Sequence, residues 1–358
     1  LKEVSTGLIK ISKIRSFQKI ELLKIDKEIQ LLAKRAFQLH IFYETLHPNK
    51  TSDLIKDHIK NDLSTIIPIL LRLGTLREPK VPIETYIRYI ESNDPDLMPL
   101  VIELVESTFS PIAGRLTIPL IDSAINPLDV ASDLFKENFL SEDEMLIFWI
   151  NNSHYWKTII AIHYCILNEN INLLRQIGWS EIPIDLFKNN IYSKSEQEYL
   201  NRNFFNKKIP DQNNLVMYSV LEKTILLKSV SLFQNIPGNI LSKIAQISSE
   251  IQLSQDDYIF KEGSVGDSLY IIISGNVKIT KNSKLITLLS NGDCLGEMAL
   301  LDREPRSADA VAEDEIILLK IDQEGFYELL AGNSEIMREI VKMLAQRLRS
   351  MNKEITKH

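Results

Sequence analysis

The hydrophobic pattern of the sequence changes once, after about residue 212, and this change constrains the fold more than any other feature. Before it, apolar residues recur every three or four positions, as in Leu97, Val101 and Leu104, which is the spacing of one helix face. After it come short runs rich in β-branched residues, separated by Gly, Asn and Asp. We therefore expect an α+β protein, with an all-α region over residues 1–212 and a mixed region over residues 213–358.

Signals for helix starts recur in the first region. Asp94 precedes Pro95, a pair that suits a capping carboxylate followed by the first residue of a helix. Ser141 and Glu144 have the spacing of a capping box. Several helices of similar length with short breaks predict a stacked helical array, and an irregular helical bundle is the alternative. The polar stretch 192–214 predicts a linker or a loop-rich boundary.

The second region predicts a small antiparallel barrel or roll with flanking helices. Short strands joined by turns of Gly, Asn and Asp are typical of such folds. We expect strands over residues 258–260, 269–274, 277–280, 285–289 and 316–321. We expect helices over about residues 217–230, 238–247 and 325–353.

Composition excludes several classes of function. The net charge of −7 provides no overall basic field for nucleic acid or for an anionic membrane. Cys165 and Cys294 lie too far apart for a disulfide framework or a metal motif, which fits a reducing compartment. The longest apolar runs, such as 66–71 and 145–150, are much shorter than the roughly 20 residues of a membrane span. With no visible signal peptide, these features predict a cytoplasmic location, which includes the cytoplasmic face of an inner membrane.

The residues with the clearest chemistry lie between 292 and 308. Gly296 permits close backbone approach, and the helix-prone run after it offers N–H groups and a positive dipole end to an anion. Arg306, which follows Pro305, can present a bidentate fork to a phosphate. Glu297 can accept a hydrogen bond from a ribose hydroxyl. Together these groups suit a compact ribose phosphate.

The same segment resembles the phosphate-binding cassette of cyclic-nucleotide-binding domains. The chain reads Gly-Glu-Met-Ala-Leu at 296–300 and Pro-Arg-Ser-Ala at 305–308, which matches the family's pattern. Two upstream segments, 226–233 and 262–277, resemble the lead-in and the first strands of the same domain. The resemblance covers about residues 217–353 and implies a small β-roll that senses cAMP or cGMP.

The resemblance also implies a role for each residue of the cassette. Arg306 would pair with the cyclic phosphate, and Glu297 would hold the ribose 2′-hydroxyl. The further ligand-binding residues that it implies are Gly296, Met298, Ala299, Ser307 and Ala308. A final helix would close over the base, with contacts from Arg347, Leu348 and Met351. Because Ser307 could bond either a phosphate or a guanine, the sequence only leans toward cAMP over cGMP.

Other functions find little support in the sequence. No set of nucleophile, base and orienting group can be assembled, so we expect no enzyme activity. The six histidines have no metal-ligand spacing, so we expect no metal. No helix-turn-helix follows the final helix, and the resemblance to catabolite-activator-type transcription factors therefore ends before a DNA-binding part. The family resemblance does allow a homodimer through the final helices.

A second resemblance concerns the helical region. The segments 62–74 and 92–96 resemble the HEAT-type helices of some bacterial membrane transporters of the ATP/ADP carrier type, in which such helices precede a cyclic-nucleotide-binding domain. The chain starts at Leu1 rather than Met, and we expect it to be the cytoplasmic regulatory part of such a transporter. Two alternatives remain open. The chain could be an adaptor that binds a partner protein under nucleotide control, or a scaffold with a vacant pocket.

Overall fold

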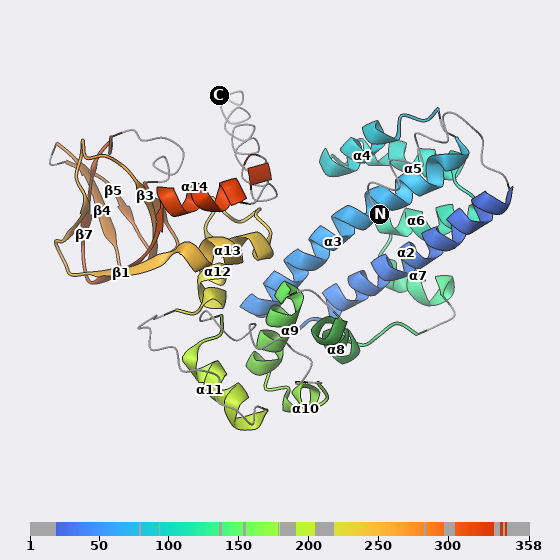
Figure 1. Ribbon diagram of the computed structural model, residues 1–358. Helices are drawn as coiled ribbons and strands as arrows, with labels where there is room; N and C mark the ends of the chain where they lie inside the picture. Colours follow the sequence, from blue (N-terminus) through green and yellow to red (C-terminus); the bar gives the residue numbers. More distant parts are fainter. Residues whose placement is uncertain are drawn as a thin grey trace. The chain divides into compact units, whose positions relative to one another are not determined.

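The computed structural model describes residues 19–78, 80–92, 94–135, 138–152, 155–177, 179, 191–204, 218–282, 284–296, 305–332, 337–338 and 341. The chain divides into two compact units, Leu1–Ser153 and His154–His358. Figure 1 shows that the first unit is helical and that the second carries the strands. The domain boundary expected from the sequence, between residues 212 and 213, lies outside the described residues.

The first unit is built of helices around two long ones. They are α2 (Lys19–Thr45), α3 (Lys50–Gly74), the 3-10 helix η1 (Thr75–Arg77), α4 (Ile83–Ser92), α5 (Met98–Thr108), α6 (Pro111–Ile121), α7 (Pro127–Leu134) and α8 (Glu142–Asn152). Helices α2 and α3 pack along each other, and α2 also contacts α6, α7 and α8 (Figure 1). The helical character expected here is confirmed, while the HEAT-type arrangement stays a prediction.

Two expected helix starts have different outcomes. The capping box before α8 is confirmed, because Ser141 N–H donates to Glu144 Oε2 at 2.8 Å and Glu144 N–H donates to Ser141 Oγ at 3.3 Å. The start expected at Asp94 and Pro95 is wrong, since α5 begins at Met98. The Asp94 carboxylate instead accepts from the Asp96 N–H at 3.0 Å and closes a turn, a common alternative use of this side chain.

The packing of the first unit depends on close aromatic contacts. The Phe42 ring of α2 meets the Trp149 ring of α8 edge to face, with 5.2 Å between centroids. Gly74, in the last turn of α3, leaves space that the Phe109 ring fills. Trp149 is thus a core residue.

The second unit contains the remaining helices and all the described strands. Its helices are α9 (Tyr155–Leu167), α10 (Ile171–Leu174), α11 (Lys194–Asn203), α12 (Val220–Ser229), α13 (Gly238–Ile247) and α14 (Gln323–Gly332). Its strands are β1 (Ser249–Leu253), β2 (Tyr258–Phe260), β3 (Ser268–Ser274), β4 (Val277–Lys281), β5 (Lys284–Leu289), β6 (Cys294–Leu295), β7 (Asp309–Ala312) and β8 (Ile316–Asp322). The five expected strands are confirmed, and β1, β6 and β7 were not expected.

The strands form two antiparallel sheets with one core between them. Their orders are β1-β8-β3-β6 and β2-β7-β4-β5. Tyr270 and Ile272 of the first sheet share a buried cluster with Val277 and Ala310 of the second. The antiparallel β-roll expected from the sequence is therefore confirmed. Helix α14 follows β8 directly and packs on both β8 and α13.

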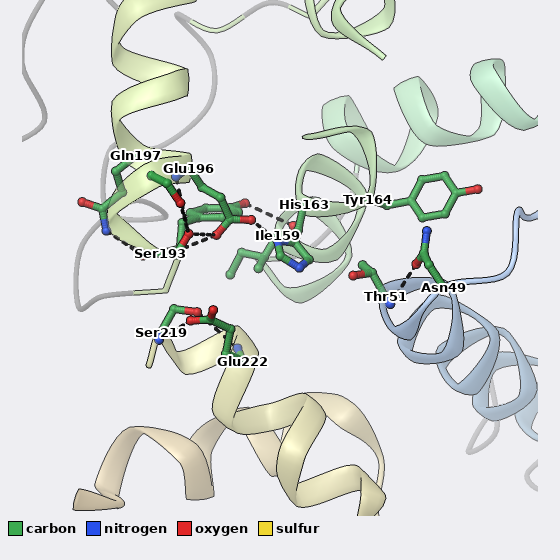
Figure 2. Close-up of polar contacts among 12 residues, drawn as sticks. Asn49, Thr51, Ile159, His163, Tyr164, Ser193, Glu196, Gln197, Ser219 and Glu222 are labelled. Carbon is green, nitrogen blue, oxygen red and sulfur yellow. Dashed lines mark hydrogen bonds and ion pairs between the residues drawn. The ribbon is translucent and has the colours of Figure 1, made fainter. Parts of the chain in front are cut away.

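A buried polar pair joins two helices before the roll. His163 Nδ1 of α9 lies 2.5 Å from Glu196 Oε1 of α11, and Figure 2 shows the two side chains facing each other. Glu196 also closes the capping box of α11, accepting from the Ser193 N–H at 2.7 Å. Burial raises the pKa of Glu196, but the hydrogen bond and charge of His163, with the bonds from Ser193, outweigh it and leave the pKa below its ordinary value.

Candidate functional site

Arg306 is the center of the candidate site. Its side chain is charged, yet only 7% of the residue is exposed. Its Nη2 donates to the carbonyl oxygen of Ser268 at 2.8 Å, and its Nη1 donates to the carbonyl oxygen of Gly296 at 3.4 Å. The guanidinium is thus held inside the roll, between the start of β3 and the residue that follows β6. Carbonyl bonds of this kind offset part of the cost of removing a cation from water.

The backbone of Arg306 is fixed independently of its side chain. Its N–H donates to the Ser264 carbonyl at 2.8 Å, and its carbonyl accepts from the Gly263 N–H at 2.8 Å. Pro305 and Val265 add an antiparallel bridge next to these bonds. The segment that enters β7 is therefore clamped to the loop that leaves β2.

Two aromatic rings lie under the guanidinium. Its Cζ atom is 4.2 Å from the ring centroid of Phe260 and 5.9 Å from that of Tyr270. The two rings contact each other, with centroids 6.1 Å apart. A ring face attracts a cation at these distances, and the attraction is stronger where water is excluded.

Gly296 is required by its surroundings. Its φ of +75° lies in the left-handed region, which other residues adopt only at a cost. A Cβ atom at this position would overlap Arg306 Nη1 and lie 3.1 Å from the Ser268 carbonyl oxygen. The close approach expected at this glycine is thus made by the arginine of the same cassette.

Only some of the other predicted site residues belong to the part of the chain that the structure describes. Ser307 is exposed and Ala308 is buried, and both lie directly before β7. Glu297, Met298 and Ala299 lie outside the described residues. So do the three residues expected on the closing helix, Arg347, Leu348 and Met351. Among the described residues, the structure brings together Arg306 and Gly296.

Sequence reasoning missed the partners of Arg306, namely Ser268, Phe260 and Tyr270. The Ser268 side chain is fully buried, with its Oγ 2.8 Å from Asp267 Oδ1 and 2.9 Å from Asp322 Oδ1, and its single hydroxyl proton can be donated to one of them at a time. Its carbonyl has the additional task of holding the arginine. No local signal could have revealed this, because the two residues are 38 positions apart in the sequence.

An acidic cavity lies where the start of α14 meets the loop before β3. Its volume is about 590 Å³, and its lining includes the carboxylates of Asp267, Asp322, Glu324 and Glu328. Burial raises the pKa of Asp322, but bonds from Lys320 and Ser268 outweigh it and hold the pKa below its ordinary value. These carboxylates are negatively charged, as a phosphate is, and therefore repel it. This cavity is therefore less suited to an anion than the surroundings of Arg306.

In the part of the chain that the structure describes, no group of three His, Cys, Asp or Glu side chains could hold a metal ion. None of the helices described is both long and apolar enough to cross a membrane.

The C-terminal part of the chain is similar to known proteins. The cyclic nucleotide-binding domain family matches residues 250–333, from β1 to beyond α14. The CRP-like cAMP-activated global transcriptional regulator of Mycobacterium tuberculosis is 28% identical over 135 residues, which are 36% of this chain and 60% of the regulator. The cGMP-dependent protein kinase, isozyme 2 forms cD5/T2, of Drosophila melanogaster is 33% identical over 141 residues, which are 37% of this chain and 15% of the kinase.

A solved structure adds a similar match. The N-terminal domain of a transcriptional regulator from Streptomyces coelicolor A3(2) has 27% identity and a TM-score of 0.35, covering 36% of this chain and 95% of that one. The family match, together with the regulator and the kinase, shows that the C-terminal part of this chain carries a cyclic nucleotide-binding domain. The chain spans less than two thirds of the length of the regulator and of the kinase, and the residues that match are those of this domain.

Proposed function

We propose that the C-terminal domain binds a cyclic nucleotide and that Arg306 pairs with its cyclic phosphate. The observation that carries this proposal is a guanidinium buried inside the roll and held by backbone carbonyls next to the cassette glycine. Its bond to Gly296 is long, 3.4 Å, and a phosphate oxygen would offer a shorter charge-assisted bond in exchange. The fork of an arginine also matches two phosphate oxygens at once.

The rest of the ligand would follow the cassette. Glu297 directly follows Gly296, and its carboxylate would accept the ribose 2′-hydroxyl. The N–H groups of Met298 and Ala299 would cradle the phosphate, with Ser307 adding a hydroxyl and Ala308 a small side chain. We propose cAMP as the preferred ligand over cGMP, and closure over the base by the helix that contains Arg347, Leu348 and Met351.

Calorimetry on the purified chain tests this function. The titrants are cAMP, cGMP, ATP and 5′-AMP, of which the last has the same base and sugar without the ring-closed phosphate. We expect cAMP to bind most tightly. Arg306→Ala should weaken binding about 10- to 200-fold, because a charged hydrogen bond contributes roughly 1.5–3 kcal/mol. Lys261→Ala is the control, since it removes a cation next to Phe260 that lies over the exposed Tyr258 ring instead.

Two negative results of this calorimetry would have different meanings. Unchanged cAMP affinity in Arg306→Ala would refute the role of that residue. Absence of heat with every cyclic nucleotide, confirmed by an unmoved melting temperature, would refute the function and favor a scaffold with a vacant pocket.

We further propose that the chain is a non-catalytic regulatory part of a membrane transporter. Support comes from a helical region preceding a cyclic nucleotide-binding domain and from the resemblance of residues 62–74 to transporter tails. The gene should then encode about a dozen hydrophobic segments upstream of Leu1. The alternative, an adaptor gated by nucleotide, predicts a partner protein whose capture on the immobilised chain changes when cAMP is added.

A further inference from the structure

Phe260 lies against the face of the Arg306 guanidinium, with its ring centroid 4.2 Å from Cζ. We propose that Phe260 is the positioning residue for the phosphate-binding arginine and sets the affinity of the domain for its ligand. The proposal rests on the function proposed above. The proposal gives Phe260 no contact with the nucleotide, because the ring acts through Arg306.

A ring face holds a guanidinium in a way that suits anion binding. The attraction is between the cation and the electrons of the ring, so it uses none of the N–H groups of the arginine. A carboxylate in the same place would bind those N–H groups in competition with a phosphate and would cancel the positive charge. The ring therefore orients the cation and leaves its charge available to the ligand.

Phe260 is itself held firmly in position. It belongs to β2, pairs with Ala310 of β7, and packs against the buried cluster between the two sheets. The Tyr270 ring of β3 braces it at 6.1 Å and lies 5.9 Å from Arg306 Cζ. Both sheets thus contribute a ring to the support of one cation.

The backbone and the side chain of Arg306 have separate supports. The bonds to Gly263 and Ser264 fix the backbone, and they do not involve the Phe260 ring. Removing the ring should therefore leave the backbone of Arg306 in position and allow only its guanidinium to change orientation. A loss of affinity without a loss of fold is the expected signature.

The same strand offers a matched control. Tyr258, two residues earlier, is an exposed aromatic residue with Lys261 Nζ 4.6 Å from its ring centroid. Tyr258→Leu removes a cation–ring contact from β2 without touching Arg306. The experiment measures the cAMP dissociation constant and the melting temperature of the ligand-free protein for the wild type, Phe260→Leu, Phe260→Tyr and Tyr258→Leu.

We expect Phe260→Leu to weaken cAMP binding about 5- to 30-fold, the range of a desolvated cation–ring contact. Phe260→Tyr restores a ring and should bind within about twofold of the wild type, as should Tyr258→Leu. If Phe260→Leu binds as the wild type does, or if Phe260→Tyr binds as weakly as Phe260→Leu, the inference is overturned. Absence of binding by the wild type would instead refute the proposed function.

Discussion

The Nη1 atom of Arg306 occupies the space where a side chain at position 296 would begin, because a Cβ atom on Gly296 would overlap it. The two residues come from the two ends of the cassette, and the guanidinium of Arg306 fills the space that a side chain at position 296 would need. Ser268 adds the third contact through its carbonyl oxygen. Two backbone carbonyls and the missing side chain at position 296 thus act together with the Phe260 ring in positioning the guanidinium.

Gly296→Ala should displace the guanidinium and weaken cyclic nucleotide binding about tenfold or more, the loss of one charged hydrogen bond. It should also cost about 1–2 kcal/mol of folding stability, since its φ is +75°. Gly292→Ala separates the two effects, because Gly292 has a φ of +89° and nothing within 4 Å of an added Cβ. That variant should lose stability and keep its affinity. Equal affinities of the two variants in calorimetry would contradict the contact.

Lys223 links α12 to the first strand of the roll. Its Nζ lies 3.1 Å from Glu250 Oε1 and 3.3 Å from the Ser248 carbonyl oxygen, and its side chain is 8% exposed. Lys223→Met should reduce the free energy of unfolding by about 3 kcal/mol, because it leaves the Glu250 carboxylate, which is only 14% exposed, without its cation. Chemical denaturation measures this change.

The matched control is a similar pair at the surface. Lys278 and Glu313 are 3.3 Å apart and each is 36% exposed. Lys278→Met should change stability by less than about 1 kcal/mol. If the two methionine variants lose similar amounts of unfolding free energy, burial of the Lys223–Glu250 pair adds nothing to its contribution to stability.

The Glu196–His163 pair should make stability depend on acid. The pKa of Glu196 is below its ordinary value of 4.5 in the folded protein, so the stabilisation is complete above pH 4.5 and is lost as the pH falls through the lower folded value. Glu196→Gln should lower stability at pH 7 by about 1–3 kcal/mol and flatten the decline below pH 4.5. Thermal melts between pH 3 and pH 7 measure both effects.

Glu222 provides the control for this experiment. It holds the same place in a capping box, with Ser219, at the start of α12 (Figure 2). Glu222→Gln should cost about 0.5–2 kcal/mol of stability through a weakened cap. If the two glutamine variants have the same pH profile, the histidine contributes nothing to the dependence.

The sequence predicted those features that depend on neighbouring residues. Helical spacing and turns of Gly and Asn were sufficient for the helical region and for five strands. Strand β7 was missed because Asp309–Ala312 contains two alanines, which have low strand propensity, and it forms because β2 and β4 offer pairing on both sides. The bond from Arg306 to Ser268 spans 38 residues and exists only once the roll closes.

The first unit allows a test of packing that is independent of any ligand. Gly74 has helical dihedral angles, so an alanine there is not strained in its backbone, but the added Cβ would overlap the Phe109 ring. Gly74→Ala should therefore destabilise the protein by about 1–3 kcal/mol through overpacking. Gly114, within α6, has its nearest neighbours 3.9 Å from an added Cβ, so Gly114→Ala should stabilise by about 0.5–1 kcal/mol through helix propensity alone. Denaturant unfolding of both variants measures the difference, and a stabilising Gly74→Ala would mean that Phe109 does not fill the space beside α3.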